Sequence, residues 1–129
     1  MFILDKLKIA SKEIKDSIDK NPQHPKLIAL IELSDFSSRM FLESQDKREI
    51  FLCFMIKSFI ENIQNNFGVD TFYDAEIQKT RVSLYKKIPH FIDNIVNAIE
   101  RQNDKLLVNS FCEMLNDYSD KINHLNKFK

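Results

Sequence analysis

The chain has 129 residues, of which 43% are hydrophobic, with 19 basic side chains set against 19 acidic ones and a single glycine. This length predicts one domain, residues 1–129, whose core is large enough to be stable without metals or disulfide bonds. The zero net charge argues against direct binding to nucleic acid or to a membrane surface, and the lone glycine nearly excludes a P-loop, a Rossmann unit and a β-sandwich, which need glycine in their turns and loops.

Apolar residues recur at helical spacing along almost the whole chain, and no stretch alternates strictly enough to predict a strand. A first helix is expected at about 2–20, and the proline-rich turn after it predicts a second helix at about 25–44. The second helix is apolar around most of its circumference, which is typical of a central helix in a bundle. The stripe that the first helix should bury consists of Ile3, Leu7, Ala10, Ile14 and Ile18.

A third helix is expected to start after Asp46, which forms a near capping box with Glu49, and to end at Phe67, just before Gly68. Its first half, residues 50–56, is apolar all round, whereas its second half is apolar on one side only. We therefore expect the first half to be deeply buried and the second half to lie at the surface.

A further helical pattern starts near Asp70 or Thr71 and contains Pro89. Proline inside a helix removes one backbone hydrogen bond and clashes with the preceding turn, which predicts a break. The apolar stripe nevertheless keeps its phase across the proline. One kinked helix over 71–102 and two separate helices both fit this pattern.

The last helix is expected at about 104–127, capped by Asn103 and Asp104. Five or six helices with short polar turns predict an all-α fold, a compact single-domain bundle of antiparallel helices. Residues 89–122, and more loosely residues 28–63, resemble the helical pairs of HEAT-type repeats. That resemblance implies a repeat-like scaffold as an alternative.

Cys53 and Cys112 lie far apart, on or beside apolar stripes, and form no CxxC motif, so we expect reduced, mostly buried thiols. The first helix carries charges every few residues, unlike a signal peptide. The longest apolar run, residues 50–56, is far shorter than the roughly 20 residues of a membrane span. A cytoplasmic location is therefore predicted.

Three carboxylates and a histidine share one face of the last helix, within about 60° of the helical wheel. Such a set suits either a metal ion or a basic protein. The face points away from the core stripe of its helix, however, whereas carboxylate metal sites in bundles project inward. We expect a solvated or docking face rather than a metal site, formed by Glu113, Asp117, Asp120 and His124.

Acidic and aromatic residues also gather where the fourth helical pattern begins. Acids near a helix start favour the dipole, so their charge alone needs no functional explanation. Phe72, however, lies about 130° from the helix stripe and is expected to be exposed. An exposed aromatic residue ringed by carboxylates is typical of a hot spot that imitates nucleic-acid phosphates in a basic cleft. The candidate contact residues are Asp70, Phe72, Tyr73, Asp74 and Glu76.

The string from Asp70 to Tyr73, Asp-Thr-Phe-Tyr, is similar to the Asp-Ser-Tyr-Tyr-Pro string of the small helical immunity proteins that block DNase colicins. This resemblance implies contact roles for Asp70 and Tyr73. Asp74 stands where those proteins have proline, and this chain is considerably longer. The resemblance implies an antidote that docks on a basic toxin nuclease.

The sequence contains no HExxH motif, no serine elbow and no other set that would assemble a nucleophile, a base and an orienting group. We predict a non-enzymatic protein-binding module without a cofactor. It is expected to be an immunity or antitoxin-type inhibitor that acts, as a monomer or weak dimer, on a basic bacterial toxin domain. The alternatives are a helical scaffold or self-associating protein, and a small helical enzyme or ligand-binding bundle.

Overall fold

The computed structural model describes residues 1–23, 25–26, 28–67 and 75–126. Within these ranges the chain forms five helices and no strand, which confirms the all-α prediction. None of these helices is long and apolar enough to cross a membrane. The helices are α1 (Phe2–Lys20), α2 (Ile28–Glu43), α3 (Lys47–Phe67), α4 (Ala75–Glu100) and α5 (Asp104–Asn126).

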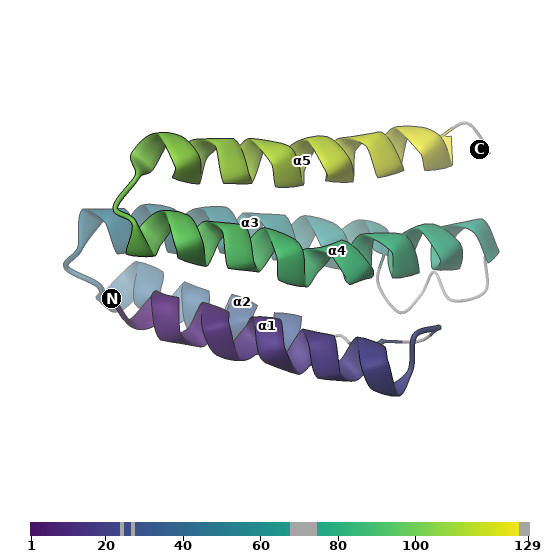
Figure 1. Cartoon of the computed structure of the whole chain (residues 1–129), viewed down its shortest axis with the longest axis horizontal. Coiled ribbons are helices and arrows are strands. Elements are labelled where there is room, and N and C mark those ends of the chain that lie inside the picture. Colours follow the sequence, from purple (N-terminus) through teal and green to yellow (C-terminus); the bar gives the residue numbers. More distant parts are fainter. Residues whose placement is uncertain (24, 27, 68–74, 127–129) are drawn as a thin grey trace.

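The helices lie in two layers, with α1, α4 and α5 side by side in front and α2 and α3 behind them (Figure 1). Each helix runs antiparallel to the one before it, so α3 and α5 run in the same direction. α1 packs against both α2 and α4 and thus joins the two layers. Across the layers, the hydroxyl of Tyr118 on α5 donates to the backbone oxygen of Asn62 on α3 at 2.9 Å.

α1 forms as predicted, because its apolar residues recur every three or four positions and all point to one side. Ile3, Leu7, Ala10 and Ile14 are buried, and Ile18 is partly buried against the same core. The helix ends where the backbone N–H of Asn21 still donates to the carbonyl of Ser17, just before a proline. The predicted bounds of this helix are confirmed.

The start of α3 combines a local cap with a long-range one. Asp46 caps the helix as expected, since its Oδ1 accepts the backbone N–H of Arg48 at 2.9 Å. Glu49, the predicted partner in a capping box, turns instead into the protein and is buried. Its Oε2 accepts the backbone N–H of Ile3 at 3.0 Å and its Oε1 accepts the hydroxyl of Ser44 at 2.8 Å. Glu49 therefore caps the first turn of α1 from a different helix.

The prediction that the second helix is central was wrong. α2 packs against α1 and α3 only on one side, because α1 separates it from α4 and α5 (Figure 1). Apolar residues that would be covered in a central helix therefore remain exposed, among them Ile28 and Leu42.

The expected all-round burial of the first half of α3 was only partly correct, because Leu52, Cys53 and Ile56 are buried but the outward-facing rings are not. Phe51 and Phe54, in the all-apolar first half, are 48% and 55% exposed. Phe59 and Phe67, in the second half, are buried because α5 covers them. Their rings meet the ring of Tyr118 edge to face, with centroids 5.8 and 6.1 Å apart.

α4 is one continuous helix that contains Pro89, so the single-helix alternative is the correct one. Its C-terminal turn places Gln102 in the left-handed region at φ 52°, and the backbone N–H of Asn103 donates to the carbonyl of Ala98. The side chain of Asn103 then accepts the backbone N–H of Leu106 at 2.9 Å and caps α5 as predicted. The expected helix stop at Gly68 lies outside the described residues.

Candidate docking surfaces

Charged side chains line the contact between α4 and α5, and we call this row the α4–α5 seam. Asp117 lies at its centre, with Lys87 Nζ 2.8 Å from Oδ1 and Lys121 Nζ 2.8 Å from Oδ2. The Asp117 side chain is only 17% exposed, so the expectation of a fully solvated face was wrong at this position. The face lies beside α4, which supplies one of the two lysines. The seam consists of Glu76, Lys87, His90, Glu113, Asp117, Asp120, Lys121 and His124.

The seam brings Glu76, from the start of α4, beside the carboxylate face of α5, which lies far from it in the sequence. Glu76 belongs to the acidic start of α4, and its Oε2 lies 3.8 Å from Nε2 of His124 on α5. Further along, Glu113 Oε1 lies 3.6 Å from Nε2 of His90. All four side chains are about half exposed. The predicted residues Glu76, Glu113, Asp117, Asp120 and His124 therefore share one surface, while Asp70, Phe72, Tyr73 and Asp74 lie outside the described residues.

A shallow groove of about 280 Å³ occupies one end of the seam. It carries both carboxylates and lysines. No group of three or more histidine, cysteine or acidic side chains in the described ranges is arranged to hold a metal ion. The groove is lined by Glu76, Lys79, Thr80, Ser83, Asp120, Lys121 and His124.

Asp117 is the carboxylate of the seam that the fold itself uses. Partial burial alone would raise the pKa of Asp117, but the hydrogen bonds from Lys121 and Lys87 outweigh burial and lower that pKa below its ordinary value of 3.8. The same contact raises the pKa of Lys87. The lysines therefore hold Asp117 in its charged form.

Replacing Asp117 with asparagine should lower the free energy of unfolding by roughly 1–2 kcal/mol at pH 7. A carboxylate whose pKa is lowered in the folded state stabilises the protein above its unfolded pKa, and that contribution disappears as the pH falls through the folded value. The difference between the two proteins should therefore shrink below about pH 4. Urea denaturation at pH 7 and pH 3 measures it, with Asp120→Asn as the exposed control. An equal difference at both pH values would show that the ion pairs are not its source.

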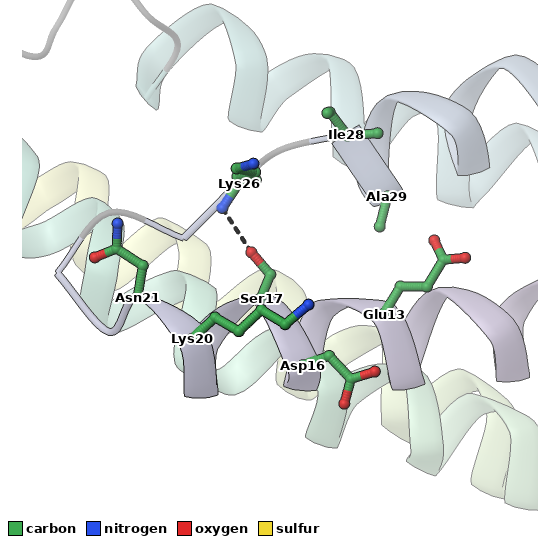
Figure 2. A pocket seen from close by; sticks show the side chains of 8 residues that line it. All are labelled: Glu13, Asp16, Ser17, Lys20, Asn21, Lys26, Ile28 and Ala29. Atoms are coloured by element: carbon green, nitrogen blue, oxygen red, sulfur yellow. Dashed lines mark hydrogen bonds between the residues drawn. The ribbon is translucent and has the colours of Figure 1, made fainter.

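A second pocket, which the sequence did not indicate, lies between the end of α1 and the start of α2 (Figure 2). Its volume is about 320 Å³. The hydroxyl of Ser17 accepts the backbone N–H of Lys26 at 2.7 Å and ties the two segments together. Glu13 and Asp16 line the pocket together with Lys20. Both signs of charge are present, as they are in the groove of the seam, so charge alone assigns no class of ligand to this pocket.

The outer faces of α2 and α3 were also not identified from the sequence as a candidate docking surface. Leu42 is 81% exposed and Ile28 59% exposed, and the ring of Phe41 lies beside that of Phe54 with centroids 6.1 Å apart. A signal was present in the sequence, because on a helical wheel Ile28 falls within the polar arc around Asp35 and Leu42 falls next to it. Isolated exposed apolar residues are common, but a row of them on neighbouring helices is typical of an interaction surface.

The two cysteines are both free thiols. Cys53 is buried as expected, and burial, with a smaller contribution from Glu49, raises the pKa of its thiol to about 11. Such a thiol is a poor nucleophile at neutral pH. Cys112 is exposed, so the expectation that both thiols are mostly buried was wrong for this residue.

No protein-family model matches the chain, and comparisons with curated proteins and with solved structures found no match either. The function has to be inferred from the surfaces of the chain itself.

Proposed function

We propose that the protein is a protein-binding module of the antidote type. It docks on a basic toxin nuclease through the exposed carboxylates of the α4–α5 seam and covers the cleft that holds nucleic acid. The observation that carries this proposal is the contact between Glu76 and His124, which brings a carboxylate of α4 onto the same surface as the carboxylates of α5. Carboxylates on one surface attract a basic partner and speed its association.

The carboxylates of the seam differ in how strongly they are held within the chain. Asp117 is held by two lysines at 2.8 Å. Glu76 and Glu113 contact histidines at 3.6 Å or more, and Asp120 is exposed at the rim of the groove. The long contact between Glu113 and the exposed His90 contributes little to stability. A lysine or arginine from a partner can therefore replace that contact with little loss to the fold.

The cavity in the core of the described bundle is too small to be a comparable site. It has a volume of about 20 Å³ and is lined by apolar residues such as Leu33, Ile60 and Met114. Ligand sites usually enclose several hundred cubic ångströms and contain a few polar groups. The surface groove is the better candidate, and an open groove suits a protein partner.

The test compares two charge-reversed triple variants. Glu76→Lys, Glu113→Lys and Asp120→Lys together reverse the seam, whereas Glu13→Lys, Asp16→Lys and Asp19→Lys make the same change in charge on α1. Each protein is used as bait in an extract of the native host, and any captured basic protein is purified and assayed for cleavage of DNA and RNA. We expect wild type and the α1 variant to inhibit the captured nuclease, and the seam variant to bind it roughly 100-fold more weakly.

Circular dichroism establishes that all three proteins are equally helical. The proposal fails if a folded seam variant inhibits the nuclease as well as wild type does. It also fails if the captured partner is acidic or has no nuclease activity that the chain blocks.

A further inference from the structure

The outer face of α2 carries a stripe with coiled-coil spacing. Ile28, Ile31, Asp35, Ser38 and Leu42 follow one another at alternate steps of three and four residues. A repeat of 3.5 residues is the pattern by which two helices pack side by side along their length. We call these five residues the α2 stripe.

The α2 stripe lies opposite the side that holds α2 in the bundle. Ala29, Leu33 and Ser37 are buried, whereas Ile31 is 43% exposed and Leu42 is 81% exposed. α2 lies at the edge of the rear layer, so a further helix has access to it from outside (Figure 1). The fold thus presents a helix with two packing faces, one of which is used within the chain.

We propose that a second copy of this chain docks on the α2 stripe, with the two α2 helices antiparallel about a two-fold axis. In the coiled-coil register this places Ile31 against Leu42 of the second copy, and Asp35 against its Ser38. The hydroxyl of Ser38 donates to the carbonyl of Ser34 at 3.1 Å within the chain, and in that pairing it turns to donate to Asp35 of the second copy. Because the axis is two-fold, each contact forms twice and the same surface serves both partners.

The charges beside the stripe favour this orientation. Glu32 and Arg39 flank it on one side, at equivalent positions of successive heptads. In an antiparallel pair such positions meet each other, so Glu32 of each copy faces Arg39 of the other. A parallel pair would instead place the two copies of Asp35 together, and like charges in contact are unfavourable. The charges of α2 therefore complement those of a second α2 helix that runs in the opposite direction.

Both charged residues are only weakly engaged within the chain. Glu32 lies 3.9 Å from Lys6 and is about half exposed, and such a pair contributes little to stability. The guanidinium of Arg39 lies over the ring of Phe36, 5.6 Å from its centroid. A change of rotamer brings either side chain to a partner.

The other flank of the stripe is aromatic, since the adjacent rings of Phe41 and Phe54 are both partly exposed. Stable specific interfaces bury about 1,200 Å² or more in total, and a contact through one helix of 16 residues from each copy is expected at or below that limit. We therefore expect a reversible dimer with a dissociation constant on the order of micromolar.

Sedimentation velocity over a range of protein concentrations tests the dimer. Wild type should shift from monomer to dimer with rising concentration. Leu42→Glu should remain monomeric, because it places a charge against Ile31 of the second copy. Val108→Glu on α5, at a residue that is 54% exposed, is the matched control and should dimerise like wild type. A wild type that stays monomeric at every concentration, or a folded Leu42→Glu that dimerises fully, overturns the proposal.

A charge swap tests the partner and the orientation together. Arg39→Glu and Glu32→Arg should each weaken the dimer roughly tenfold, because each creates two like-charged pairs. The double variant should recover wild-type affinity, since its two new pairs are again opposite in charge. A double variant that is weaker than both single variants contradicts antiparallel pairing. Reversal of the seam charges on α4 and α5 should leave the dimer intact, which separates this test from that of the proposed function.

Disulfide trapping reports the register directly. In a Cys112→Ser background, a mixture of the Asp35→Cys and Ser38→Cys proteins should form cross-linked heterodimers under mild oxidation. Each protein alone should cross-link poorly, because the antiparallel register separates identical positions. Efficient cross-linking of either protein with itself would indicate a parallel arrangement and exclude the proposed one.

Discussion

Replacing Glu49 with alanine is expected to lower the free energy of unfolding by about 3 kcal/mol. Its carboxylate accepts the backbone N–H of Ile3 at 3.0 Å and the hydroxyl of Ser44 at 2.8 Å. The residue is only 3% exposed. Hydrogen bonds to a charged group are among the stronger ones in proteins, and alanine leaves both donors without this acceptor. The negative charge also lies at the positive end of α1, where it is favourable.

Urea denaturation monitored by circular dichroism measures the loss, with two comparisons that identify its cause. Glu49→Gln keeps an acceptor oxygen but removes the charge, so it should lose about half as much stability. Glu43→Ala removes an exposed carboxylate at the same end of the bundle and should change stability by less than about 0.5 kcal/mol. A Glu49→Ala protein as stable as the Glu43→Ala protein would show that the cap to α1 contributes nothing.

Most helix bounds could be predicted from the sequence because short-range interactions determine them, but α2 begins at Ile28 and not near Pro25 as expected. Asp46 and Asn103 accept backbone N–H groups two or three residues ahead, and such contacts depend only on the local chain. The stripe of α1 likewise needs only a periodicity of 3.6 residues to be recognised. The continuity of α4 through Pro89 was left open, because a proline in a helix is tolerated only where packing compensates for the lost hydrogen bond.

The errors arose where burial depends on which helices become neighbours. Periodicity shows that a segment has an apolar face but not that anything covers it, so Phe51 and Phe54 were wrongly expected in the core. Glu49 belongs to a recognisable capping-box motif. Its carboxylate nevertheless accepts the backbone N–H of Ile3, which lies 46 positions away in the sequence. Long-range pairings of this kind leave no local pattern in a single sequence.

The candidate site was predictable in its parts but not in its assembly. The sequence indicated Glu76 and the acids on the face of α5 as separate candidates, and α4 and α5 must pack antiparallel in the observed register for Glu76 to reach His124. The same packing places Asp117 in two ion pairs, so its charge is not available to a partner. The α2 stripe and the seam lie on helices of different layers (Figure 1). A dimer formed through α2 therefore leaves the seam of each copy free to bind a partner.

Tyr85 on α4 is among the largest fully buried side chains, and replacing it with alanine is expected to lower the free energy of unfolding by about 4 kcal/mol. The ring fills the core, and the guanidinium of Arg81, which is also buried, lies 5.6 Å from its centroid. Burial raises the pKa of the Tyr85 hydroxyl and lowers the pKa of Arg81. Loss of the ring leaves a cavity and removes the aromatic face beside a poorly solvated cation.

Tyr85→Phe distinguishes packing from hydrogen bonding, because it keeps the ring and removes only the hydroxyl. That hydroxyl lies 3.5 Å from the carbonyl oxygen of Lys26, at the limit of a hydrogen bond, so its loss should change the free energy of unfolding by less than about 1 kcal/mol. Phe51→Ala removes a ring of similar size from the surface and should lower stability by well under half as much as Tyr85→Ala. If the phenylalanine variant were as unstable as the alanine variant, the hydroxyl rather than the ring would be what holds α4 to the segment before α2.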